Sequence, residues 1–340
     1  AAGMMLGLAY PLTRDALDAG TIGATIGAWG AVVTLFAVHA WFDLDSGDAV
    51  PPARAQLGAA LHSAPEGLAL GVALIGTQLL VVLGLLSPEL STYVPPALPW
   101  FSIALGSTLF GVGMALVGTC SFGSLVRLGA GDMRSLIVMI VFGAVAYATL
   151  RGMLATFRID VLERLAVDVP GAVQGDLPSV LQWIGGHDGR VPLTLGAGLV
   201  LIAVVFADRR LRRAPRLVTA GIVLGLGVVL GWWATGVAVD AFEIAPRAQS
   251  LTFVSPVGRA LYAVLTTPVG LADFGVASIF GVILGSFASA LYDGEFRWEA
   301  FDDPYEMRRH LTGAVLMGFG GILAGGCTIG QGISAGSMMA

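Results

Sequence analysis

The chain has 340 residues, a net charge of −5 and a mean hydropathy of +0.83, with 56% hydrophobic and only 12% charged residues. Because soluble domains carry about 25% charged residues, this composition excludes an ordinary soluble domain and favours a membrane protein. The only two cysteines lie far apart in the sequence, so they do not form the framework of a disulfide-rich secreted domain.

Several apolar segments approach the roughly 20 residues that a helix needs to cross a bilayer. They lack the strict alternation of a membrane β-strand, and a helix satisfies its own backbone hydrogen bonds in lipid. The segments are residues 21–42, 67–86, 98–119, 135–154, 191–207, 217–239 and 274–291. We therefore predict an all-α polytopic membrane protein, with residues 1–340 as a single transmembrane domain of about eight or nine membrane segments.

Two stretches of the chain do not fit a full crossing. Residues 43–66 are rather acidic and are predicted to be a cytoplasmic loop. In residues 240–273, Ser255-Pro256 and Thr267-Pro268 bracket a short apolar run, which predicts one or two half-helices that do not span. The chain begins without a methionine and stops inside a glycine-rich motif, so we expect both ends to be truncated.

The arginines indicate the orientation of the segments. All 18 basic residues are arginine, and five of them lie in the short stretch 208–216 between two apolar segments. Short loops rich in arginine stay in the cytoplasm. Counting outward from this loop predicts that residues 87–99 and 156–190 are external and that residues 293–309 are cytoplasmic.

Both cysteines belong to one motif that occurs twice. Residues 106–123 read GSTLFGVGMALVGTCSFG and residues 313–330 read GAVLMGFGGILAGGCTIG, with eight of eighteen positions identical. On the predicted orientation the two copies cross the membrane in opposite directions. Paired repeats of opposite polarity around a shared site are typical of transporters. We therefore predict two half-repeats, residues 67–155 and 217–340.

Each motif has the chemistry of an anion site at a broken helix. Glycines let a helix break, and a following half-helix, such as residues 121–128, would direct backbone N–H groups and its positive dipole end at a cavity. Hydroxyl and amide side chains add donors, and the thiols add soft donors that suit sulfur. The predicted substrate-binding residues are Gly118, Thr119, Cys120, Ser121, Gly123, Gly325, Gly326, Cys327, Thr328, Gly330 and Gln331.

Simpler interpretations exist for these residues. A buried cysteine is often a small hydrophobe, and membrane glycines are often packing contacts; the inverted duplication favours the site. Arg127 and Arg134 could attract an anion, although anchoring at a helix end is the simpler role.

The four histidines lack metal-ligand spacing and are interpreted as interfacial or loop residues. No common catalytic motif is present, so we expect neither an enzyme nor a cofactor.

The chain resembles the YeeE/YedE family of sulfur transporters. The likeness runs from about residue 99 to the C-terminus and is carried by GVGMALVGTCSFGSLVRLGAGD, GVASIFGVILGSF and GAVLMGFGGILAGGCTIGQGISAGSMM. It implies short helices that converge on a central passage, with Cys120 and Cys327 in contact with the substrate and the motif glycines shaping the passage. Two departures are the lack of a third cysteine, which many members carry after the first helix, and Ala130, where an acidic residue is common.

The resemblance implies uptake of thiosulfate or a related sulfur anion across the bacterial inner membrane. The expected partners are that anion, membrane lipid and a cytosolic sulfur-carrier or sulfurtransferase protein, with no nucleic acid. Three alternatives remain open at this point: transport of another sulfur or selenium species, a membrane thiol–disulfide redox protein, and a structural subunit of a sulfur-relay complex.

Overall fold

The computed structural model describes residues 52–88, 91–93, 97–165, 167–168, 190–207, 209–237, 248–266, 273–301 and 303–339. Helices dominate this part of the chain, and its only strands are the two-residue β1 (Ala97–Leu98) and β2 (Val167–Asp168), which pair antiparallel. The prediction of an all-α fold is therefore confirmed. The predicted segment 21–42 lies outside the described residues.

Seven helical spans in the described part are long and apolar enough to cross a membrane. They confirm a polytopic membrane protein, and five match predicted segments within a few residues. A sixth, Trp100–Gly129, contains most of the predicted segment 98–119 and continues through the first cysteine motif. The seventh span carries the second cysteine motif. The longest helix of each span is α3 (Pro52–Val82), α4 (Trp100–Val117), α6 (Met133–Arg151), α9 (Arg190–Ala207), α11 (Pro215–Val237), α13 (Phe274–Asp293) or α14 (Pro304–Leu323).

One boundary differs from the prediction. The helix α3 begins at Pro52, so most of the predicted loop 43–66 is helical. Residues 55–64 are rich in alanine and leucine, which have high helix propensity. Pro52 suits the first turn of a helix, where no backbone N–H is needed. The apolar part of α3 that is suited to the membrane begins at Pro65.

Shorter helices connect or interrupt the spans. The helix α12 (Ser255–Leu265) has 11 residues and is about 16 Å long, too short for a hydrocarbon core of about 30 Å. It agrees with the half-helix predicted in residues 240–273. The other short elements are α5 (Ser121–Gly129), α7 (Met153–Phe157), η3 (Arg158–Leu162), η4 (Glu163–Leu165), α10 (Arg209–Arg212), η6 (Thr328–Ala335) and α15 (Gly336–Met338).

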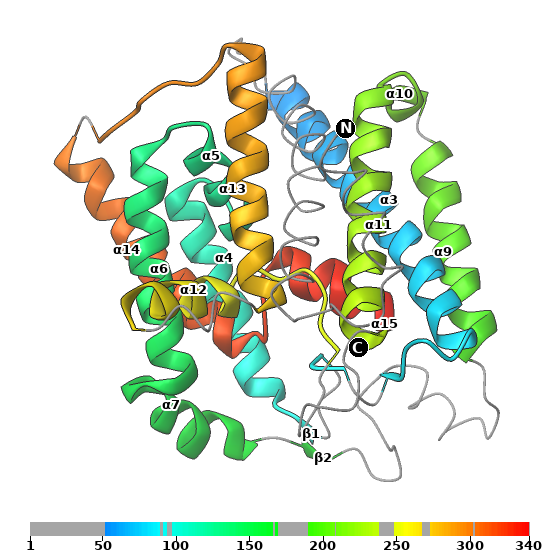
Figure 1. Cartoon of the computed structure of the whole chain (residues 1–340), viewed down its shortest axis with the longest axis horizontal. Helices are drawn as coiled ribbons and strands as arrows, with labels where there is room; N and C mark the ends of the chain where they lie inside the picture. The colour runs from blue at the N-terminus through cyan, green and yellow to red at the C-terminus, as the bar shows by residue number, and fades with distance from the viewer. Residues whose placement is uncertain are drawn as a thin grey trace, which may run out of the picture. The chain divides into compact units, whose positions relative to one another are not determined.

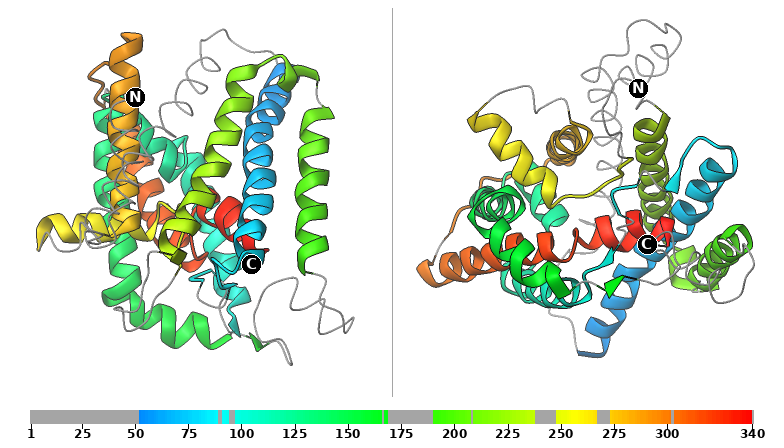
Figure 2. Two further views of the ribbon diagram at one scale, coloured as in Figure 1. Left: turned by 45° about the vertical axis from the view of Figure 1, so that its right-hand side comes forward. Right: turned by 90° about the horizontal axis from the view of Figure 1, so that it is seen from below.

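The chain forms two compact units. In the described residues, the first consists of segments from 95–170 and 251–331, and the second of segments from 33–94, 171–250 and 332–340. In the second unit, α3 packs between α9 and α11 (Figure 2) and also contacts α15. Trp232 of α11 is fully buried there, and its indole N–H donates to the Ser337 hydroxyl at 3.0 Å.

The first unit contains both cysteine motifs. Its α14 packs against α4 and α6, α12 packs against α6 and α13, and α5 lies between α6 and α13 (Figure 1). At one end β1 pairs with β2, which joins two stretches that the sequence predicts to be external. At the other end Asp132 forms an isolated bridge with Glu299, and Glu299 belongs to the stretch predicted to be cytoplasmic. Because the chain is predicted to cross inward after residues 87–99, Asp132 is expected on the cytoplasmic side too, and segments predicted on the same side thus meet.

The helices α4 and α14 are antiparallel and are brought together by their glycines. A Cβ atom added to Gly106 would lie 2.7 Å from the carbonyl oxygen of Gly320, and one added to Gly113 would lie 2.7 Å from that of Gly313. In the alignment of the two motifs, Gly106 corresponds to Gly313 and Gly113 corresponds to Gly320. Replacing each glycine by its counterpart therefore turns one of these two contacts into the other. The pair therefore has the approximate two-fold relation expected for copies of opposite polarity.

Candidate functional site

The first cysteine motif forms a sharp turn between α4 and α5. Gly118 ends α4 with φ = 82°, a left-handed conformation that favours glycine, and its N–H donates to the Met114 carbonyl at 2.7 Å. Cys120 then has extended backbone and caps α5: its Sγ accepts a hydrogen bond from the N–H of Gly123 at 3.4 Å. The thiol therefore lies at the positive end of a short helix.

The second motif repeats this geometry. Gly325 follows α14 with φ = 80°, and the Sγ of Cys327 accepts from the N–H of Gly330 at 3.3 Å. The helix that follows, η6, is a π-helix, a rare form that is frequent at functional sites. Cys327 is buried, Cys120 is partly exposed, and the two thiols, both in the described part of the chain, are not joined in a disulfide.

Met114 connects the two turns. Its backbone carbonyl accepts from the N–H of Gly118 in the first turn, and its Sδ lies 3.9 Å from the hydroxyl of Thr328 in the second. Thr328 is exposed and directly follows Cys327 in the sequence. The two motifs, whose cysteines are 207 residues apart in the sequence, are therefore neighbours in the fold.

Three hydroxyl groups around the first turn are buried without a hydrogen-bond partner in the described structure. They belong to Thr119, Ser121 and Ser124, whose side chains are at most 8% exposed. The Thr119 oxygen lies against Gly123, because a Cβ atom added there would be 2.0 Å from it. A buried hydroxyl without a partner is costly, and of these three residues only Thr119 lines the cavity beside the turn.

The second turn is closed by two polar side chains. The amide of Gln331 lies over Gly325 and Gly326, with its Nε2 2.7 Å from the position of a Cβ atom added to Gly325. The hydroxyl oxygen of Thr252 is 2.5 Å from the position of a Cβ atom added to Gly330. Thr252 was not among the predicted site residues, because it lies outside both motifs and no sequence signal marks it.

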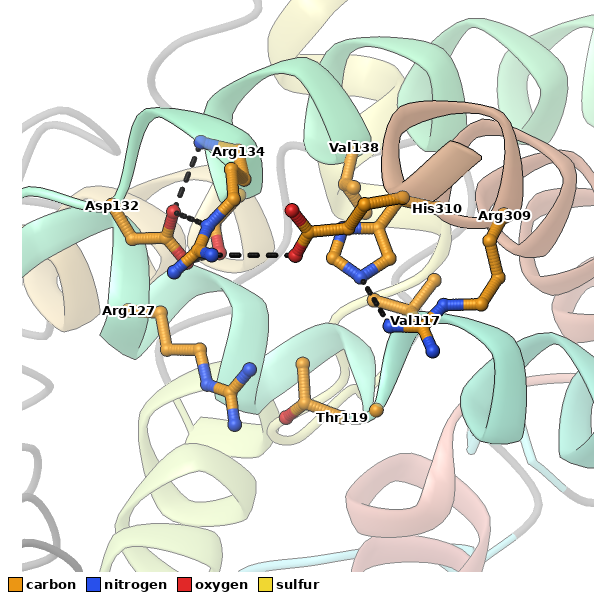
Figure 3. Close-up of a pocket in the computed structure, with 11 residues that line it drawn as sticks. Val117, Thr119, Arg127, Asp132, Arg134, Val138, Arg309 and His310 are labelled. Atoms are coloured by element: carbon orange, nitrogen blue, oxygen red, sulfur yellow. Dashed lines mark hydrogen bonds and ion pairs between the residues drawn. The ribbon is translucent and has the colours of Figure 1, made fainter. Parts of the chain in front are cut away.

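A cavity of about 220 Å³ adjoins the first turn (Figure 3). It is lined by the end of α4, by Gly118 and Thr119, and by charged residues of α5, α6 and α14. Among the described residues, Arg134 takes part in every ion pair that the residues of the cavity form. It pairs with Asp132 at 3.0 Å, with Glu306 at 3.3 Å and also with Glu299. The full lining is Val117, Gly118, Thr119, Arg127, Asp132, Arg134, Ser135, Val138, Glu306, Arg309 and His310.

Two of these residues have surroundings that the sequence interpretation did not include. Arg134 does lie at a helix end, but it also joins three carboxylates from separate segments. His310 lies within α14 and is 8% exposed, so it is not a loop residue. The spacing of Glu306 and His310, four residues apart, could have indicated one polar face at the start of that helix.

Comparison with known proteins identifies the family. The profile of the family described as sulphur transport matches residues 59–340. The chain belongs to this family. It is 29% identical over 287 residues to the thiosulfate transporter TsuA of Escherichia coli (strain K12), an alignment that covers 78% of this chain and 76% of that protein. It is 26% identical over 245 residues to the thiosulfate transporter TsuA of Spirochaeta thermophila, with 67% of each chain covered.

Within this sulphur transport protein, the predicted site residues form two groups. Gly118, Thr119, Cys120, Ser121 and Gly123 make up the first turn and the start of α5. The second turn and the start of η6 contain Gly325, Gly326, Cys327, Thr328, Gly330 and Gln331. Among the described residues, no group of three or more histidine, cysteine or acidic side chains could hold a metal ion.

Proposed function

We propose that this chain imports thiosulfate or a closely related sulfur anion across the bacterial inner membrane, and that the anion passes Cys120 and Cys327. The observation that carries the proposal is the repeated turn, in which each Sγ caps a short helix and accepts an N–H from the third residue along. The names of both relatives, which are thiosulfate transporters, support the choice of substrate.

The geometry suits an anion with a terminal sulfur atom. The first N–H groups of a helix lack intrahelical partners and favour negative charge. Taking an anion out of water is costly unless it is paired or hydrogen-bonded. Each cysteine Sγ accepts a backbone N–H, and a thiol is also a weak donor that suits a sulfur acceptor. A thiol and a thiosulfate sulfur are both soft and polarizable, which favours this contact.

The test is thiosulfate uptake by Cys120→Ala and Cys327→Ala variants in cells without another uptake route. A hydrogen bond to a charged group contributes about 1.5–3 kcal/mol, so each variant should lower uptake by about tenfold or more. Serine is a good N-cap, so Cys120→Ser and Cys327→Ser should keep the thermal unfolding midpoint and separate the capping role of the thiol from its role toward the substrate.

The matched control is Thr108→Ala, which removes an exposed hydroxyl that donates to the Ala104 carbonyl within α4. It should transport at the wild-type rate. Wild-type uptake by both alanine variants would contradict the role of the thiols. Competition with unlabelled selenium and sulfur anions then identifies the preferred substrate within the proposed class.

A further inference from the structure

We propose that the cavity beside the first cysteine turn binds a small divalent oxyanion, held by Arg127, Arg309, Thr119 and His310. The cavity has room for such an anion and a few water molecules, because about 220 Å³ compares with roughly 30 Å³ for each water in the liquid. Its role as a station on the transport route depends on the proposed function, whereas anion binding itself does not.

Both carboxylates that line the cavity accept hydrogen bonds from Arg134. Asp132 accepts from the backbone N–H and the Nε of Arg134 and from the hydroxyl of Ser135, each at 3.0 Å. Glu306 accepts from Arg134 at 3.3 Å. The positive charge of Arg134 is therefore balanced by carboxylates of the protein itself, since Arg134 also pairs with Glu299.

The remaining polar groups of the cavity are donors. In the described part of the chain, neither Arg127 nor Arg309 has a carboxylate within 4.0 Å, and the hydroxyl of Thr119 has no acceptor. Figure 3 shows Arg127 extending from α5 toward Thr119, with Arg309 and His310 across from it. Two arginines and a buried hydroxyl thus line one space, and neither arginine is within 4.0 Å of a carboxylate of the described residues.

His310 adds a donor whose proton position follows from its neighbour. Its Nε2 lies 3.4 Å from Nη2 of Arg309. Arginine only donates, so Nε2 accepts and the proton of the neutral ring is on Nδ1. That Nδ1 is buried and has no partner in the described residues. Within the described part of the chain, the ring therefore has one unsatisfied N–H beside the cavity, while its Nε2 contacts the Arg309 side chain that lines it.

Sulfate is the appropriate probe because it has the charge and oxygens of the proposed ligand but no terminal sulfur for the thiols. Binding is measured by calorimetry on the purified full chain in a weakly coordinating buffer. We expect the wild type to bind sulfate, and Arg127→Gln and Arg309→Gln to weaken binding about tenfold, because each removes a charge-assisted hydrogen bond. Arg308→Gln is the matched control, since Arg308 is exposed and adjacent but does not line the cavity.

Thr119→Val keeps the side-chain volume and removes a buried hydroxyl without a partner, so it should fold even if an arginine variant does not. It should weaken sulfate binding several-fold. The absence of sulfate binding by the wild type, an equal loss in Arg308→Gln, or unchanged binding in both Thr119→Val and Arg309→Gln would overturn the proposal. Failure of the proposed function is seen separately, as wild-type thiosulfate uptake by the cysteine variants.

Discussion

At the residue scale, the cysteines combine two roles that rarely coincide. Each Sγ stabilises the start of a helix by accepting a backbone N–H, and the glycine two positions before it has positive φ. The cap fixes the direction of the thiol, and the glycine fixes the turn that presents it. A side chain so constrained loses little conformational entropy when it binds a substrate.

Gly330 provides a test of the second turn. A Cβ atom there would lie 2.5 Å from the hydroxyl oxygen and 3.0 Å from the Cβ of Thr252. We expect Gly330→Ala to lower the free energy of unfolding by about 1–3 kcal/mol through overpacking. It should also reduce uptake, because relieving the clash displaces the backbone N–H whose hydrogen bond the Cys327 Sγ accepts. Thermal unfolding in detergent and thiosulfate uptake measure the two effects.

The control for this substitution is Gly332→Ala, because an added Cβ there meets no atom within 4 Å. Combining Gly330→Ala with Thr252→Ala should restore part of the lost stability, since the shortest contact is removed. A double variant no more stable than Gly330→Ala alone would show that the contact with Thr252 is not the cause.

Residue patterns predicted the turns better than their surroundings. The Gly-x-Cys-x-x-Gly repeat correctly predicted helix breaks at Gly118 and Gly325 and a half-helix after Cys120, because positive φ and N-cap preferences are local. The partners Thr252 and Met114 and the cavity around His310 depend on packing between distant segments. No local rule could place those residues together.

At the element scale, the close approach of α4 and α14 is the main contact of the first unit. Gly113 is the most informative position, because an added Cβ would lie 2.5 Å from the Met317 side chain and 2.7 Å from the backbone of Gly313. Backbone atoms cannot move aside cheaply, so we expect Gly113→Ala to destabilise the protein by about 1–3 kcal/mol. The measurement is the thermal unfolding midpoint in detergent.

Gly111 is the matched control on the same helix. An added Cβ there meets nothing within 4 Å, and alanine has a higher helix propensity than glycine by about 1 kcal/mol. Gly111→Ala should therefore be neutral or stabilising. Equal effects of the two substitutions would refute close packing at Gly113.

The elements also show where sequence periodicity is reliable. Apolar runs predicted the membrane helices within a few residues, because their length is set by the bilayer. The start of α3 was missed, since residues 52–64 are helical without being strongly apolar. The π-helix η6 was missed as well, because no local pattern in its residues marks a π-helix.

At the scale of the whole molecule, orientation is the property that transport requires. The predicted orientation puts residue 159 outside and residue 298 in the cytoplasm. Ile159 is 50% and Trp298 is 72% exposed, so both positions should accept a cysteine. In a background of Cys120→Ser and Cys327→Ser, a membrane-impermeant maleimide should label Ile159→Cys in intact cells and Trp298→Cys only after lysis. The reverse pattern would invert the direction proposed for the substrate.

The glycine contacts between α4 and α14 have a consequence for how the protein could be divided. Each of these helices comes from a different copy of the repeat, so neither copy can complete the pairing with its own residues. Separately expressed fragments, one carrying each motif, would have to find one another in the bilayer before either could regain its native helix contact. Complementation by such fragments would then report directly on that recognition.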